Sequence, residues 1–107
     1  MTILIKAYRY TVKGQGFLTA LDDYFDLTET FEISWVFTTK LPEPDIDMKN
    51  TTSYFTEKGN KVFRKAIKAL RRIYAEKGVQ LLCTITDIAE KDILYADKYQ
   101  VVVSEYK

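Results

Sequence analysis

Hydrophobic and polar positions alternate along residues 2–12 and 31–38, and this period of two predicts a β-strand in each. Residues 79–88 and 93–106 are also predicted to be strands, and the last of them contains the run Val101-Val102-Val103. The alternation is clearest in the second stretch, where one side carries Phe31, Ile33, Trp35 and Phe37, and we expect that side to lie in the core. The last two stretches are expected to pair as a hairpin. Both prolines fall within residues 39–53, so this segment is expected to form a loop.

Two other stretches repeat apolar residues with the period of an α-helix. The first is short, and its apolar side consists of Phe17, Leu18, Leu21, Tyr24 and Phe25. The second runs from Thr56 to Lys77 and is apolar at Val62, Phe63, Ala66, Ile67, Leu70, Ile73 and Tyr74. Thr56 is a typical N-cap residue and Gly78 a typical glycine after a helix end, so both ends of the second helix are marked.

The order of these elements, β-α-β-loop-α-β-β, predicts one α+β domain over residues 1–107. Each predicted helix has a single apolar stripe, which a sheet face would cover. We therefore expect a two-layer sandwich, in which a four-stranded, mostly antiparallel sheet carries the two helices on one face. The helix over 56–77 should lie across the strand over 31–38.

Charge is segregated in this chain rather than abundant. The formal net charge is +1, yet residues 55–77 hold eight basic and two acidic residues, a net +6, and the remainder carries −5. The basic residues lie opposite the apolar stripe of the long helix, and they are Lys58, Lys61, Arg64, Lys65, Lys68, Arg71 and Arg72. Such a stripe is typical of a surface that binds a nucleic acid backbone or an acidic protein.

Two other interpretations of the basic stripe stay open. Asp22, Asp23 and Asp26 make the short helix acidic, and residues 43–47 form an acidic part of the loop. Either group could lie beside the stripe and neutralise it. The stripe could also be a solvated helix face without a partner, and only a stripe free of carboxylates requires one from outside the chain.

The sheet face away from the helices is expected to mix apolar and polar side chains. Its apolar candidates for an interface are Leu4, Tyr8, Tyr10, Val36, Val102 and Tyr106. Apolar side chains in polar surroundings are typical of an interaction surface. This face predicts a protein partner or a homodimer.

The composition favours binding over catalysis. The chain has no histidine, which removes the usual general base and the commonest metal ligand. Its single cysteine, Cys83, lies in an apolar run and is expected to be buried. We expect no catalytic residues, no metal and no cofactor.

Together these features predict a small non-catalytic binding protein that acts through protein contacts on the open sheet face. Inhibitors, adaptors and immunity-type proteins, including those of phages and mobile elements, are of this kind. The alternative is a nucleic-acid-binding protein that uses residues 58–72. The first residues lack a signal-peptide pattern and no run reaches the roughly 20 apolar residues of a membrane span, so the cytoplasm is the expected location.

Overall fold

A computed structural model describes residues 3–105, apart from the side chains of residues 27–31 and 33. Its strands are β1 (Leu4–Val12), β2 (Gln15–Gly16), β3 (Thr51–Phe55), β4 (Leu81–Ala89), β5 (Ile93–Ala96) and β6 (Gln100–Ser104). Its α-helices are α1 (Phe17–Tyr24), α2 (Leu27–Lys40), α3 (Glu57–Val62) and α4 (Arg64–Glu76), and a 3-10 turn covers Glu90–Asp92. The predicted α+β class is confirmed, with more elements than expected.

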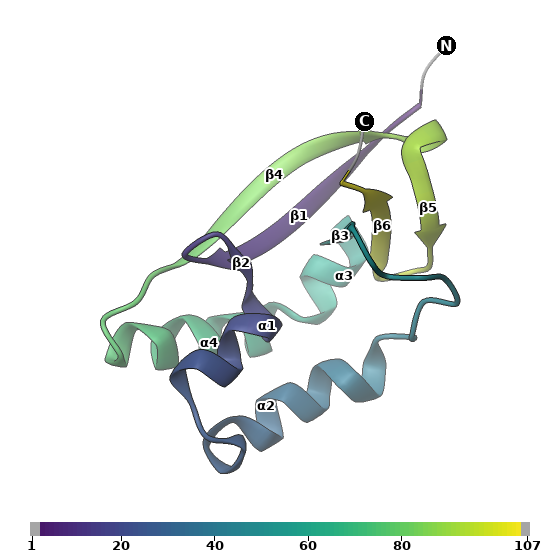
Figure 1. The fold of residues 1–107 in the computed structure, drawn as a ribbon. Coiled ribbons are helices and arrows are strands. Elements are labelled where there is room, and N and C mark those ends of the chain that lie inside the picture. Colours follow the sequence, from purple (N-terminus) through teal and green to yellow (C-terminus); the bar gives the residue numbers. More distant parts are fainter. Residues whose placement is uncertain (1–2, 106–107) are drawn as a thin grey trace.

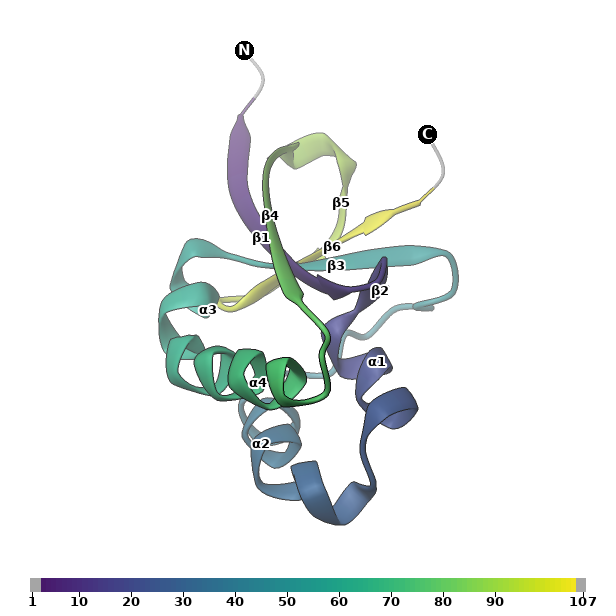
Figure 2. The ribbon, with the colours of Figure 1, turned by 90° about the vertical axis from the view of Figure 1, so that its left-hand side faces the viewer.

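The strands form one curled sheet in which the neighbouring strands run antiparallel. Its order is β2-β1-β3-β6-β5, and β4 pairs with β1. The β1–β4 pairing runs from Leu4 opposite Ala89 to Val12 opposite Leu81, and it makes the long ribbon of Figure 1. β1 meets β3 at a single pair, Tyr8 with Phe55, so the ribbon crosses the β3–β6–β5 strands at an angle (Figure 2).

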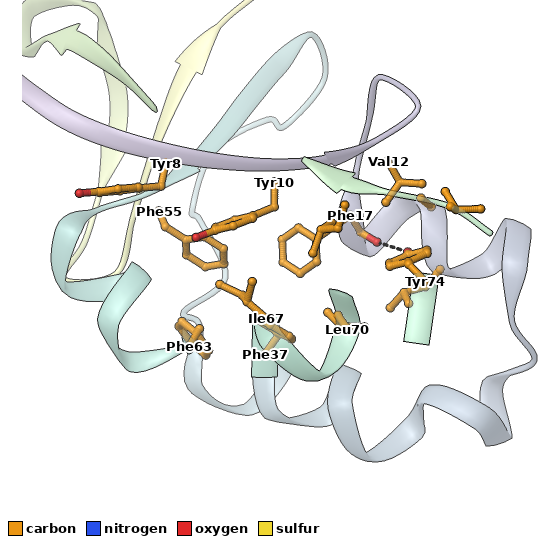
Figure 3. Close-up of a cluster of buried hydrophobic side chains, with 14 residues drawn as sticks. Tyr8, Tyr10, Val12, Phe17, Phe37, Phe55, Phe63, Ile67, Leu70 and Tyr74 are labelled. Carbon is orange, nitrogen blue, oxygen red and sulfur yellow. Dashed lines mark hydrogen bonds between the residues drawn. The ribbon is translucent and has the colours of Figure 1, made fainter. Parts of the chain in front are cut away.

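The helices lie on one side of the β1–β4 ribbon. In both views α1 and α4 lie next to the ribbon and α2 lies beyond them. The main core fills the space between these layers (Figure 3), and aromatic rings dominate it. Phe37 of α2 stacks on Phe63 with ring centroids 5.0 Å apart and meets Phe17 edge-on at 5.2 Å. The helices therefore form two successive layers over the sheet, where one was predicted.

Residues 31–38 were predicted to form a strand, and this prediction is wrong because they belong to helix α2. In a helix the alternating residues no longer share one side: Phe37 is fully buried, whereas Trp35 is 59% exposed. The side chains of Phe31 and Ile33 lie outside the described part of the structure. Eight residues with a period of two do not exclude a helix, because tertiary packing around one buried ring can outweigh local strand propensity.

The long helix predicted from Thr56 to Lys77 is divided into α3 and α4 at Phe63. Thr56 caps α3 as predicted, since its hydroxyl accepts a hydrogen bond from the Gly59 N–H at 3.0 Å. Gly78 follows α4 with a φ of +74°, as predicted for a glycine after a helix end. α4 lies between the ribbon and α2. It was expected to lie across a strand formed by residues 31–38, and these residues belong to helix α2 instead.

The strands of the C-terminal half also differ from the prediction. The segment 39–53, predicted as a loop, ends in the first residues of β3, and the segment 93–106 contains two strands instead of one. The side chain of Asp97 closes the turn between β5 and β6 by accepting hydrogen bonds from the N–H groups of Tyr99 and Gln100, at 2.8 and 3.1 Å. The hairpin is therefore β5–β6, and the hairpin predicted between β4 and the last strand is wrong.

Candidate functional site

The basic side chains of α3 and α4 lie together on the solvent side of the two helices. All seven are exposed, and we call them the basic face: Lys58, Lys61, Arg64, Lys65, Lys68, Arg71 and Arg72. Along α4 alone, from Arg64 to Arg72, the charges extend over about 12 Å at a rise of about 1.5 Å per residue. This is the exposed arrangement that the sequence predicts for these residues.

The basic face is held outward by what α4 buries on its opposite side. Ile67, Leu70 and Tyr74 are buried in the main core. The Tyr74 hydroxyl also donates a hydrogen bond to the carbonyl oxygen of Phe17 at 2.8 Å, drawn as a dashed line in Figure 3. These contacts fix the rotation of α4 about its own axis and thereby fix the direction of its charged side chains.

A hollow of about 340 Å³ opens between α4, α3 and β1. Its lining consists of Tyr10, Asn60, Arg64, Ile67, Lys68 and Arg71. A second hollow, of about 330 Å³, is lined by Arg71, Ala75, Gly78, Val79, Gln80 and Leu81. Because both hollows share Arg71, they adjoin along the side of α4 that faces the ribbon. Among the described side chains, no carboxylate lines either of them.

Tyr10 connects the first hollow to the core. Its ring lies 6.2 Å from that of Phe17 and 6.1 Å from that of Phe55, while its hydroxyl donates a hydrogen bond to the Oδ1 atom of Asn60. The pKa of the Tyr10 phenol is raised to about 12, mainly by burial and also by Cys83 on the paired strand, while the positive charge of Arg71 acts in the opposite direction. The phenol is therefore a protonated donor at neutral pH.

Two acidic residues of the first helix act on Tyr74 at the end of α4. The pKa of Tyr74 is raised to about 12, mainly by burial, and Tyr24, Asp23 and Asp22 contribute to the rise. Among the described side chains, neither of these carboxylates forms an ion pair with the basic face. Asp26 is exposed at the start of α2.

The acidic loop over 43–47 lies toward β5 instead. The pKa of Tyr95 is raised mainly by its hydrogen bond to Asp97, and the charge of Asp45 adds to it. Among residues 3–105, leaving aside the side chains of 27–31 and 33, no ion pair joins the basic face to a carboxylate. The described side chains therefore do not neutralise the basic face through ion pairs.

Three of the six residues predicted for a protein interface are buried. Tyr8 and Tyr10 point from β1 toward the helices and are buried (Figure 3), and Val102 is buried in β6. Leu4 is 58% exposed, and Val36 is half-buried on α2. The predicted open face is thus wrong for these buried residues: Tyr8 and Tyr10 belong to the side of β1 that packs in the main core under the helices. Tyr106 lies outside the described residues.

Cys83 is exposed, so its predicted burial is wrong. It lies on β4 opposite Tyr10, at an edge of the sheet that the helices do not cover completely. The sequence also did not indicate that Tyr10 and Asn60 line the hollow between α4, α3 and β1, which we call the basic hollow. The available signal was the position of Asn60, a polar residue in the first turns of the predicted helix, between Lys58 and Lys61.

A larger cleft, of about 420 Å³, opens on another side of β1. Its residues come mainly from β1, the start of α1, and β3, where β1 and β3 diverge from the Tyr8–Phe55 pair. Of the described residues in its lining, Arg9 and Glu105 are charged, one of each sign. The cleft therefore shows no preference for a ligand of either charge.

The described residues also bear on metals and membranes. In the part of the chain with described side chains, no three residues of the types His, Cys, Asp or Glu gather as a metal site would require. Within residues 3–105, none of the helices has both the length and the apolar character needed to cross a membrane.

No family model matches the chain, and comparison with curated proteins and with solved structures likewise gives no match. What the protein binds must therefore be inferred from its own side chains.

Proposed function

We propose that this protein binds the phosphate backbone of a nucleic acid through the basic face, and that its role is binding rather than catalysis. The supporting observation is that seven exposed cations lie on two adjoining helices and, among the described side chains, pair with no carboxylate. Lys and Arg side chains that neutralise phosphates release bound counterions, which supplies affinity with little dependence on base sequence. The cytoplasm is the location we propose for this activity.

The electrostatics of Lys68 add a second argument. This residue has a like charge three or four residues away in both directions, at Arg64, Lys65, Arg71 and Arg72. Each such pair destabilises a helix by about 0.2–0.5 kcal/mol. A polyanion on the basic face would relieve this repulsion, so the bound protein should be more stable than the free one.

Fluorescence anisotropy with a labelled 20-nucleotide single strand and a labelled 20-base-pair duplex tests the proposal. The dissociation constant is measured between 50 and 300 mM salt. Five to seven phosphate contacts on the duplex correspond to a slope of log K against log salt of about −4 to −6. The triple substitution Lys61→Glu, Lys65→Glu and Lys68→Glu should abolish binding.

The matched control is the triple variant Lys40→Glu, Lys49→Glu and Lys91→Glu. It makes the same change in net charge at exposed residues that lie outside α3 and α4. We expect it to retain most of the affinity. Equal losses in the two triple variants would mean that net charge and not the basic face decides binding, and no binding by the native protein at 50 mM salt would rule the proposal out.

A protein partner is the second candidate function, supported by the outer side of β4. Among the described strands β4 pairs only with β1, so its other backbone edge is free to accept a further strand. Leu82 and Ile85 on β4 are exposed, and so is Leu4 on the paired strand. A second copy or another protein could bind there by strand addition.

The mass of the protein in solution tests this second candidate. Light scattering should show a dimer or a complex, and the double variant Leu82→Asp and Ile85→Asp should return it to a monomer. A native protein that stays strictly monomeric at high concentration would exclude the homodimer.

A further inference from the structure

The hollow beside Tyr10 differs from the rest of the basic face in its chemistry. Arg64, Lys68 and Arg71 lie at spacings of four and three residues on α4, so their side chains follow one another along the same side of the helix. All three line the hollow, whereas Lys65 and Arg72 do not. The basic face therefore contains a concave part and a convex part, with the same kinds of side chain on each.

Asn60 adds a neutral donor to the concave part. Its Oδ1 atom accepts the hydrogen bond from the Tyr10 hydroxyl, which leaves the two N–H groups of its Nδ2 atom for another acceptor. The tyrosine is itself held in the aromatic core, so it fixes the orientation of the amide. The described lining thus presents three cations and an oriented amide, and it contains no carboxylate.

From this arrangement we infer that the hollow binds one phosphate group, with Arg64, Lys68 and Arg71 neutralising its charge and the Asn60 amide donating to one of its oxygens. Arg is suited to this role because its planar guanidinium can donate two parallel hydrogen bonds to phosphate oxygens. A hollow of about 340 Å³ is of the size that holds a small ligand. The inference rests on the proposed function in taking the phosphate to belong to a nucleic acid backbone, and a phosphorylated small molecule would offer the same chemistry.

A pair of neighbouring arginines provides the test. Arg71→Gln and Arg72→Gln remove the same charge from the same helix, but only Arg71 lines the hollow. Binding of a 12-nucleotide oligothymidylate should weaken about tenfold in Arg71→Gln, because a charge-assisted hydrogen bond is lost, and only about twofold in Arg72→Gln. Thermal unfolding of both variants checks that the fold is unchanged.

Nuclear magnetic resonance of the ¹⁵N-labelled native protein supplies a direct readout. Inorganic phosphate, added at constant ionic strength in exchange for chloride, should shift the side-chain amide signals of Asn60 and the Nε–H signals of Arg64 and Arg71. The Nε–H signal of Arg72 should move little. The oligothymidylate should shift the same set of signals.

The outcomes separate the inference from the proposed function. Equal losses in the two arginine variants, with an unmoved Asn60 signal, would overturn the phosphate site and leave nucleic-acid binding by the basic face intact. Phosphate-dependent shifts at Asn60 without oligothymidylate binding would overturn the nucleic acid as the source and assign the site to a phosphorylated small molecule. No response to either probe would overturn both.

Discussion

Gly59 in α3 lies directly against the backbone of Tyr99 in the turn between β5 and β6, and a Cβ atom on Gly59 would overlap the Tyr99 carbonyl oxygen. The same oxygen accepts a hydrogen bond from the Thr56 N–H at 3.0 Å, and the Thr56 hydroxyl donates to the Lys98 carbonyl oxygen at 2.7 Å. The start of α3 is thus joined to this turn by close contact. By its propensity alone, a glycine weakens a helix. At position 59 a glycine is nevertheless required, because the packing against Tyr99 leaves no room for a Cβ atom.

Gly59→Ala should therefore destabilise the protein by about 1–3 kcal/mol, because the methyl group meets backbone that cannot rotate away. Urea unfolding followed by circular dichroism measures this change. Gly16→Ala is the matched control, since Gly16 has a φ of −55° and nothing lies within 4 Å of its added Cβ. Its free energy of unfolding should change by less than about 1 kcal/mol. Equal effects at the two glycines would contradict the packing explanation.

The helical assignment of residues 31–38 can be tested by a pair of aromatic truncations. Phe37→Ala should cost about 3–5 kcal/mol of stability, because its ring is fully buried against Phe63 and Phe17. Trp35→Ala should change stability by less than about 1 kcal/mol, since its side chain is mostly exposed. A strand would place both rings on one face of the sheet, so similar large losses in both variants would favour the strand.

Lys68→Gln should stabilise the free protein by about 1 kcal/mol while weakening nucleic-acid binding. The substitution removes four like-charged pairs at once, whereas Lys65→Gln removes only the pair with Lys68 within α4. Thermal unfolding at 20 mM salt should show the larger gain for Lys68→Gln, and the gain should shrink in 1 M salt, where exposed charges are screened. A loss of stability in Lys68→Gln would show that another interaction offsets the repulsion.

Asp97 should make stability depend on pH in acid. Burial acts to raise the pKa of its carboxyl, but the N–H of Tyr99, the Tyr95 hydroxyl and both donors of Gln100 outweigh it, so the pKa is lowered from 3.8. A carboxyl with a lower pKa in the folded state stabilises the protein above the unfolded value, and this stabilisation is lost as the pH falls through the folded value. Asp97→Asn should flatten the fall in unfolding free energy below about pH 4. An unchanged acid limb in this variant would assign the dependence to other carboxyls.

Tyr10→Phe should distinguish the contribution of the Tyr10 hydroxyl, which orients Asn60, from the contribution of its ring to the aromatic core. The ring contacts with Phe17 and Phe55 remain possible, while the Asn60 Oδ1 atom loses its donor, so stability should fall by only about 1 kcal/mol. Oligothymidylate affinity should fall about threefold, as expected when an amide is no longer held in place. The control is Tyr54→Phe, which removes a phenol outside the basic hollow, and equal losses of affinity in the two variants would argue against an oriented Asn60.

The same tyrosine should make the free energy of unfolding fall in alkali. Its folded pKa of about 12 lies above the ordinary value of 10.0, so its stabilisation is complete below pH 10 and is lost as the pH rises through 12. Absorbance titration at 295 nm of the native protein and of Tyr10→Phe should differ by one phenol that titrates near pH 12. A difference near pH 10 instead would mean that the phenol is more accessible to water than its packing indicates.

Local signals in the sequence were sufficient for part of this structure. The cap at Thr56, the glycine at Gly78 and the two sides of α4 are all properties of neighbouring residues, and the sequence predicts each of them. The basic face is predicted for the same reason, because helix periodicity alone places its charges on one side.

Contacts between distant residues account for what the sequence did not reveal. Phe37 could be assigned to a helix only from its place between Phe17 and Phe63, which are 20 and 26 positions away in the chain. The pairing of β4 with β1 depends in the same way on residues more than 60 positions apart. Predicting the hollow would have required both kinds of information, because its cations follow a local pattern, whereas Tyr10 is 50 positions away from Asn60 in the chain.

The break at Phe63 bears on the geometry of the hollow beside Tyr10. The Phe63 backbone bonds to both helices: its N–H donates to the Gly59 carbonyl oxygen at 3.0 Å, and its carbonyl oxygen accepts from the Ile67 N–H at 2.9 Å. An uncharged, buried residue thus stands between the segment that carries Asn60 and the segment that carries the arginines. A substitution of Phe63 would therefore leave the surface charge as it is, so a change in the relative position of these two segments need not change the electrostatic attraction of the basic face.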